Sequence, residues 1–192
     1  MGLFREFHYG KKQLDMAASD SEASADSTLR DATPAELARG QYKKGEVVYM
    51  GLPVCIENPK GSTRSGDGWE VTFPIHYGEF RDHMGADGDA VDCFIGPTTT
   101  SQRVFICNQH MRSPKVFDEH KVFLGCSELK TAQYYYDECH TDDWASQVSN
   151  EWVETTIDHL KYWLVNGDKR LPFPQTDTYD YKLISLTLRR QG

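Results

Sequence analysis

Short apolar runs separated by turn-forming residues dominate the chain beyond residue 40. Clusters of Gly, Pro, Ser and Asn stand between these runs, which is typical of a compact, mainly-β domain and not of alternating βαβ units. No internal repeat is visible. We therefore expect β-strands over residues 47–50, 54–57, 69–73, 91–95, 104–107 and 121–124.

Two longer segments carry helical spacing instead of alternation. Residues 127–140 predict one helix. Residues 150–167 predict a second helix, with Asn150 as its cap and Gly167 as its stop. Its apolar face would carry Val153, Ile157, Leu160 and Leu164. After a proline-rich loop, residues 181–188 alternate well enough to predict a final strand.

The first 40 residues differ in composition from the rest. Residues 15–36 contain six acids and one arginine among many Ser and Ala. Such a segment buries too little apolar surface to offset the entropy of ordering it, so we expect a flexible acidic arm over residues 1–40. A capping box at residues 33–36, with Gly40 as the stop, predicts one short helix within the arm. Residues 41–192 would then form one domain that ends in the second helix and the final strand.

Length and charge narrow the class of protein. A chain of 192 residues is long enough for one domain with a proper core. Its 29 acids against 21 bases give a net charge of −8, which argues against nonspecific binding to nucleic acid or to an anionic membrane. The five cysteines lack C-x-x-C spacing, so we expect small buried thiols and a reducing compartment.

An acidic cluster marks the candidate site. Asp87, Asp89 and Asp92 fall within six residues, and Gly88 lets the backbone bend sharply between the first two. Carboxylates this close repel one another and are rarely left without a compensating cation. Mg²⁺ takes oxygen ligands and usually binds through one or two carboxylates plus substrate phosphate. The run therefore predicts a metal site, with an ion-free acidic turn as the alternative. A calcium loop of the EF-hand type fails on spacing, because Val91 stands where an oxygen ligand is needed.

Several ordered motifs resemble those of a known family. They are YKKG (42–45), GLPVCIENPKGSTRSG (51–66), HYG (76–78), GADGDAVDCFIGP (85–97) and FDEHKVFLG (117–125). Together they resemble soluble, single-domain, Mg²⁺-dependent inorganic pyrophosphatases, and more closely a phage-associated branch of pyrophosphatase-like domains. The resemblance implies an α+β, mainly β fold, a small closed OB-like β-barrel with flanking helices. It also implies hydrolysis of pyrophosphate, in the cytoplasm of an infected bacterial host or in the virion.

The resemblance assigns roles to individual residues. The metal ligands, for more than one Mg²⁺ ion, would be Asp87, Asp89, Asp92 and Glu57, assisted by Glu119 or Asp118. Asp89 or Asp92 would also position the attacking water. The phosphate contacts would be Lys60, Arg64 and Lys121, with the Tyr77 hydroxyl as a further donor. Which of Asp118 and Glu119 is the ligand stays open.

Departures from the family pattern leave a second reading open. Ala90 stands where the family has proline, and Asp137 stands on the tyrosine-rich helix where lysine is expected. The alternative is a virion-associated structural or assembly protein with weak or no activity, which docks to other virion proteins through residues 1–40 or forms a homo-oligomer. A third reading, hydrolysis of a nucleotide, is disfavoured by the small number of basic residues and the lack of a P-loop.

Overall fold

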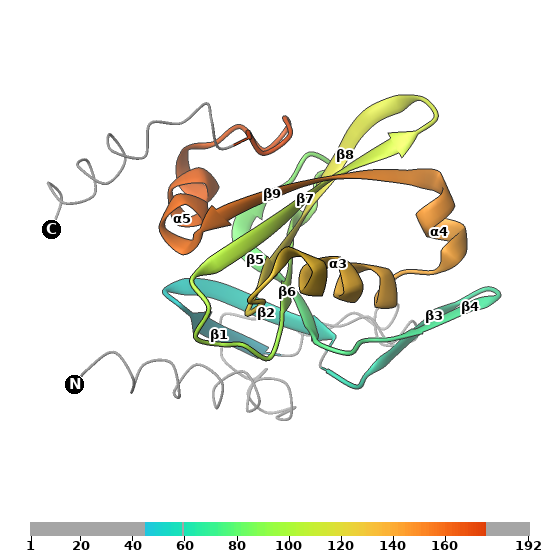
Figure 1. Cartoon of the computed structure of the whole chain (residues 1–192), viewed down its shortest axis with the longest axis horizontal. Coiled ribbons are helices and arrows are strands. Elements are labelled where there is room, and N and C mark those ends of the chain that lie inside the picture. The colour runs from blue at the N-terminus through green and yellow to red at the C-terminus, as the bar shows by residue number, and fades with distance from the viewer. Residues whose placement is uncertain (1–44, 59, 176–192) are drawn as a thin grey trace, which may run out of the picture.

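A seven-stranded sheet forms the centre of the fold (Figure 1). The computed structural model describes residues 45–58 and 60–175. Along the sheet the strands lie in the order β1-β2-β5-β6-β8-β7-β9. Their bounds are β1 Gly45–Tyr49, β2 Leu52–Asn58, β5 His76–Met84, β6 Ala90–Ile95, β7 Arg103–Arg112, β8 Lys115–Leu124 and β9 Val148–Thr156. Neighbouring strands are antiparallel except β6 and β8, which run parallel.

A separate hairpin and three helices complete the described part of the chain. The hairpin pairs β3 (Thr63–Gly66) with β4 (Trp69–Thr72) and projects away from the large sheet (Figure 1). The helices are α3 (Leu129–Glu138), α4 (Asp142–Gln147) and α5 (Ile157–Asn166). Thr141 caps α4, because its hydroxyl accepts a hydrogen bond from the Trp144 N–H at 3.3 Å.

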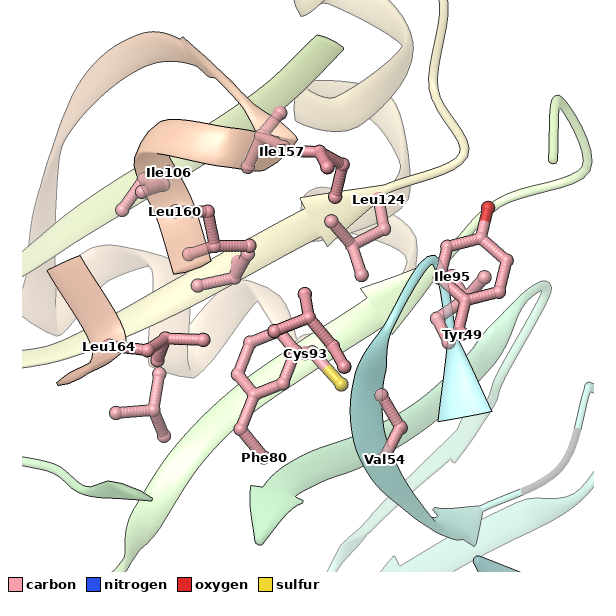
Figure 2. Close-up of a cluster of buried hydrophobic side chains, with 14 of the residues drawn as sticks. Tyr49, Val54, Phe80, Cys93, Ile95, Ile106, Leu124, Ile157, Leu160 and Leu164 are labelled. Carbon is pink, nitrogen blue, oxygen red and sulfur yellow. The ribbon is translucent and has the colours of Figure 1, made fainter. Parts of the chain in front are cut away.

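The central strands bury both of their faces. Side chains alternate along a strand, so neighbouring residues point to opposite sides of the sheet. On one side, Cys93 of β6 and Leu124 of β8 belong to the core that includes Leu160 and Leu164 of α5 (Figure 2). We call this side the α5 face. On the other side, the α3 face, the strands bury residues that pack with α3: Phe94, Phe105, Phe123, Ala132 and Tyr136.

All six predicted strands are present, and three others were not predicted. The structure adds β3, β5 and β9. Strand β5 reads HYGEFRDHM, and its mixed polar and apolar residues gave no continuous apolar signal. The helix predicted over residues 127–140 is confirmed as α3. The predicted arm, its short helix and the strand at 181–188 lie outside the described residues.

The helix predicted over residues 150–167 is wrong in its first half. The segment forms β9 up to Thr156, and only α5 is helical. Val153, which fits the helical spacing, instead lies opposite Ile106 of β7 in the sheet. The Thr156 hydroxyl then accepts a hydrogen bond from the His159 N–H at 3.3 Å and so begins the helix. The predicted stop at Gly167 is confirmed.

The mainly-β class with flanking helices is confirmed. The strand pairings run from β1 at one edge to β9 at the other, and no pairing within residues 45–58 and 60–175 joins these two edges. Closure into a barrel therefore stays a prediction. All five cysteines are buried and none forms a disulfide bond, as expected from their apolar neighbours. None of the helices described is both long enough and apolar enough to cross a membrane.

Candidate active site

A cleft of about 460 Å³ lies between the β3–β4 hairpin and α4. Its walls come from segments far apart in the sequence. The hairpin contributes Arg64 and Trp69, β5 contributes Tyr77, β8 contributes Lys121, and α4 contributes Trp144. The cleft therefore joins basic, hydroxyl and aromatic side chains in one space.

Four side chains form a connected cluster, which we call the charged cluster: Tyr77, Asp92, Glu119 and Lys121. Tyr77 and Lys121 line the cleft, and the two carboxylates bind to them. The Tyr77 hydroxyl donates to Asp92 Oδ1 at 2.9 Å. Lys121 Nζ donates to Asp92 Oδ2 and to Glu119 Oε2, the latter at 2.7 Å. The side chains of Lys121 and Asp92 are only 10% and 13% exposed. The buried ammonium of Lys121 thus donates hydrogen bonds to two carboxylates.

Strand pairing explains why residues so distant in sequence meet. Asp92 of β6 lies directly beside Lys121 of β8 in the parallel pair. Asp92 shares a face with Phe94, two residues along β6, and Lys121 shares a face with Phe123 in the same way. Both charged residues therefore continue the α3 face beyond its apolar core.

Two irregular positions bring β2 and β5 into the site. Gly78 follows Tyr77, and a Cβ at this glycine would lie 2.0 Å from the Cys55 carbonyl oxygen. Only glycine allows β5 to approach β2 this closely at that point. A register shift between Ile56 and Asn58 forms a bulge at Glu57. Bulges commonly change the direction of a side chain next to active sites.

The electrostatics of Tyr77 place two further predicted residues near it. Burial raises the pKa of the Tyr77 hydroxyl well above its usual value, and the negative charges of Asp92 and Glu57 raise it further. The positive charge of Arg64 acts on the same pKa in the opposite direction. Glu57 and Arg64 therefore belong to the same electrostatic environment as the charged cluster.

Asp92 and Glu119 both pair with Lys121, and burial and these charges shift the pKa values of Glu119 and Lys121. Burial raises the pKa of Glu119 to about 7 against the opposing effect of Lys121, and the charges of Asp92 and Asp87 add to the rise. Burial alone would lower the pKa of Lys121, but Asp92 and Glu119 together raise it. Lys121 is therefore held as a cation among surplus negative charge.

Three other predicted site residues form hydrogen bonds outside the charged cluster. Asp89 is exposed, and its backbone N–H donates to Asp87 Oδ1 at 3.2 Å. Lys60 is exposed as well, and its backbone N–H donates to His76 Nδ1 at 3.0 Å. Asp118 accepts from Gln109 Nε2 at 2.9 Å. Between Asp118 and Glu119, it is Glu119 that contacts Lys121.

Sequence reasoning missed the residue that supports both acids of β8. Gln109 of β7 is fully buried, and its Nε2 donates to Asp118 and to Glu119, each at 2.9 Å. Its Oε1 accepts a hydrogen bond from the Tyr136 hydroxyl of α3. The available signal was a polar Asn-Gln pair at the end of the apolar run VFIC. Tyr136 is itself buried, and its hydroxyl holds this amide in place.

Comparison with known families decides the affiliation of the chain. A family model described as inorganic pyrophosphatase matches residues 34–165, which is more than half of the sequence. The chain belongs to the inorganic pyrophosphatase family. No curated protein matches the sequence. The matched residues of this pyrophosphatase domain include the whole charged cluster, whereas membership of the phage-associated branch stays a prediction.

The donor set of the pyrophosphatase domain suits a hard divalent cation. Within residues 45–58 and 60–175, no three His, Cys, Asp or Glu side chains lie close enough together to hold a metal ion. Lys121 instead stands between Asp92 and Glu119. The donors around it are carboxylate oxygens whose charge exceeds that of one ammonium, and this is the chemistry that Mg²⁺ prefers.

Proposed function

We propose that this chain hydrolyses inorganic pyrophosphate to two phosphate ions with the help of Mg²⁺. The observation that carries the proposal is the charged cluster, which meets a cleft containing Arg64 inside a domain of the inorganic pyrophosphatase family. Pyrophosphate is a polyanion, and catalysis of phosphoryl transfer depends on positioning and on stabilising its negative charge. The Lys121 ammonium can stabilise this negative charge directly, and the carboxylates beside it can do so by holding divalent cations.

The cationic side chains would hold the substrate. Lys121 and Arg64 both line the cleft, so their N–H groups can donate charge-assisted hydrogen bonds to phosphate oxygens. Tyr77 stays protonated because its pKa is raised, and its hydroxyl fixes the orientation of Asp92. Lys60 was predicted as a third basic contact and lies on the exposed turn between β2 and β3.

The carboxylates would hold the divalent ions. Asp92, Glu119 and Glu57 share the electrostatic environment of the cluster, and Asp87 acts on the pKa of Glu119. Asp89 and Asp118 remain further candidates as ligands. Bound Mg²⁺ ions would neutralise substrate charge and lower the pKa of water. Gln109 fixes Glu119 from behind through its amide.

Phosphate release from pyrophosphate in excess Mg²⁺ tests the proposal directly. We expect turnover by the wild type and a loss of at least about a hundredfold in Asp92→Asn, because removing one preorganised electrostatic group commonly has this effect. Asp158→Asn is the matched control, since Asp158 is exposed on α5 and is not part of the cleft. If a folded wild-type protein releases no phosphate with Mg²⁺, Mn²⁺ or Zn²⁺, the catalytic proposal is wrong.

One observation favours the second candidate, a virion-associated structural or assembly protein. The pairing of Lys121 with both carboxylates stabilises the site without any added ion. A domain that had lost catalysis would keep such an arrangement as a structural ion-pair cluster. The same assay separates the two candidates: a folded protein without turnover, recovered with assembled particles of an infecting phage, would support the structural role.

A further inference from the structure

The cleft contains an aromatic wall, formed by Trp69, Phe73, Phe94 and Trp144, that pyrophosphate would not use. Trp69 is 39% exposed at the end of the β3–β4 hairpin, although it is a large apolar side chain. Trp144 comes from α4, on the other side of the cleft. An inorganic polyanion has no apolar or planar surface to place against two indole rings.

Local structure holds the Trp69 ring and fixes the backbone of Trp144. A Cβ at Gly66 would lie 2.4 Å from Trp69 Nε1, so the ring rests directly on the glycine backbone across the hairpin. Trp144 follows the capping residue of α4, where the Thr141 hydroxyl accepts a hydrogen bond from its backbone N–H. The Trp69 ring is therefore positioned by the hairpin before any ligand arrives, which lowers the entropic cost of binding.

The size of the cleft points to an organic ligand. Its volume of about 460 Å³ lies within the range of about 300–1,000 Å³ that is usual for sites of organic ligands. Asp143 and Gln147 of α4 also line it and supply polar atoms next to the indole rings. Aromatic rings with a few polar groups recognise nucleobases, which stack on the rings and form hydrogen bonds through their edges.

We infer that this cleft also accepts a nucleoside 5′-diphosphate or 5′-triphosphate as a substrate. The base would stack on Trp69 or Trp144, and the phosphate chain would reach Arg64 and Lys121. This inference rests on the proposed function, because the same water attack and the same cations are used. The oxygen of water bonds to the terminal phosphorus, and the bond to the bridging oxygen breaks. The bridging oxygen leaves with the electron pair, and the protons of the water pass to the products and the solvent.

The aromatic wall offsets two features that disfavour a nucleotide substrate. The sequence offers no P-loop and few basic residues. A P-loop is one way to bind nucleotide phosphates, but here the cations come from β8 and from the hairpin. Stacking on an indole can then supply the affinity that a phosphate-binding loop would provide elsewhere.

The test compares ADP and pyrophosphate on one set of variants in excess Mg²⁺. Trp144→Ala and Trp69→Ala should each lower kcat/KM for ADP by about tenfold relative to kcat/KM for pyrophosphate, since stacking contributes on that order for each base. Trp144→Phe keeps an aromatic ring and should recover most of the ADP activity. Tyr134→Ala is the control, because this exposed aromatic residue of α3 lies outside the cleft.

The outcomes separate this inference from the proposed function. Turnover of pyrophosphate, with neither binding nor turnover of ADP, would overturn the nucleotide inference and leave the pyrophosphatase in place. ADP turnover that is equally fast in both alanine variants would also overturn it. If neither compound is hydrolysed by the folded protein, the proposed function fails first. Calorimetric titration with ADP then shows whether binding depends on Trp69, which is exposed and whose removal leaves the core intact.

Discussion

The α5 face and the α3 face are built from alternate residues of the same strands, yet they bury different things. On β6, Cys93 points into the apolar core under α5, and its neighbour Asp92 points to the charged cluster. On β8, Leu124 and Lys121 divide in the same way. The α5 face buries mainly apolar side chains, whereas the α3 face passes from stacked aromatic rings to ionised groups and a cleft. Alternate residues of β6 and β8 thus form the apolar core on one side of the sheet and the charged cluster on the other.

The aromatic rings of the α3 face connect its core to the charged cluster. Phe94 stacks on Phe123 with ring centroids 4.6 Å apart, and Tyr77 contacts Phe94 at 5.0 Å. Tyr77 then donates its hydroxyl to Asp92. An acid held by a residue of the packed core cannot rotate freely, so the rigidity of the core extends into the site. Mutations on the two faces should therefore separate loss of activity from loss of stability.

The largest expected effect comes from Lys121→Met on the α3 face. Phosphate release from pyrophosphate should fall by about 10²–10³-fold, because a preorganised cationic donor is removed. Asp92 and Glu119 would also lose their shared partner, and breaking a buried pair destabilises a protein by about 3–5 kcal/mol. Lys115→Met, an exposed position at the start of the same strand, should change neither quantity. Full activity in the Lys121 variant would remove this residue from the mechanism.

A cavity on the α5 face should have the opposite signature. Leu160→Ala removes a fully buried side chain and should lower the free energy of unfolding by about 2–5 kcal/mol. Urea titration measures this change. The fraction that remains folded should keep its turnover of pyrophosphate, since Leu160 does not touch the cleft. A large loss of kcat in a fully folded sample would contradict the separation of the two faces.

Gly78→Ala tests a position that should affect both stability and activity. The new methyl group would lie 2.0 Å from the Cys55 carbonyl oxygen, so β5 must move away from β2. Overpacking of this kind destabilises by about 1–3 kcal/mol. The movement would also carry Tyr77 away from Asp92, so activity and stability should fall together. Unchanged denaturation curves would show that the strands can separate there without penalty.

The smallest effect near neutral pH concerns a buried histidine that faces Trp163 of α5. His120 is 2% exposed, and burial lowers the pKa of its imidazole to about 4, from an ordinary value of about 6.5. Above pH 6.5 the ring is neutral in both states and the stability is fully present. As the pH falls from about 6.5 to 4, His120 becomes protonated in the unfolded chain but stays neutral in the folded protein. The free energy of unfolding therefore decreases.

The size of this pH effect follows from linkage. His120 should contribute a slope of about 1.4 kcal/mol per pH unit to the free energy of unfolding within that window. Urea titrations of wild type and His120→Gln between pH 7 and pH 4 measure it as a difference of slopes. The difference should vanish above pH 7, and parallel curves throughout the range would contradict the assignment.

The sequence predicted the apolar strands well because their signal is local. It failed at β9, where Val153, Ile157, Leu160 and Leu164 fit helical spacing. Pairing with β7 draws Val153 into the sheet, and such a contact between distant segments cannot be read from spacing. The β5 strand was missed for a different reason: its polar residues break the apolar pattern.

The sequence identified several residues of the site but not how they are arranged in space. Motif order identified Asp92, Lys121 and Tyr77, which the structure brings together. It could not show that Asp89 would lie on an exposed turn, because strand β6 begins only at the next residue, Ala90. Nor could it find Gln109, whose importance depends on the pairing of β7 with β8. Residues that act through nonlocal pairing carry little signal of their own.

The Lys121 ammonium and a divalent ion would be alternative partners of the same two carboxylates. Lys121 is the internal counter-ion of Asp92 and Glu119. A divalent ion that binds these carboxylates must displace it, and the released ammonium then becomes available to an incoming phosphate. Metal and substrate would consequently favour each other's binding by the same factor, as thermodynamic reciprocity requires. The resting protein would hold each ligand weakly alone and both tightly together.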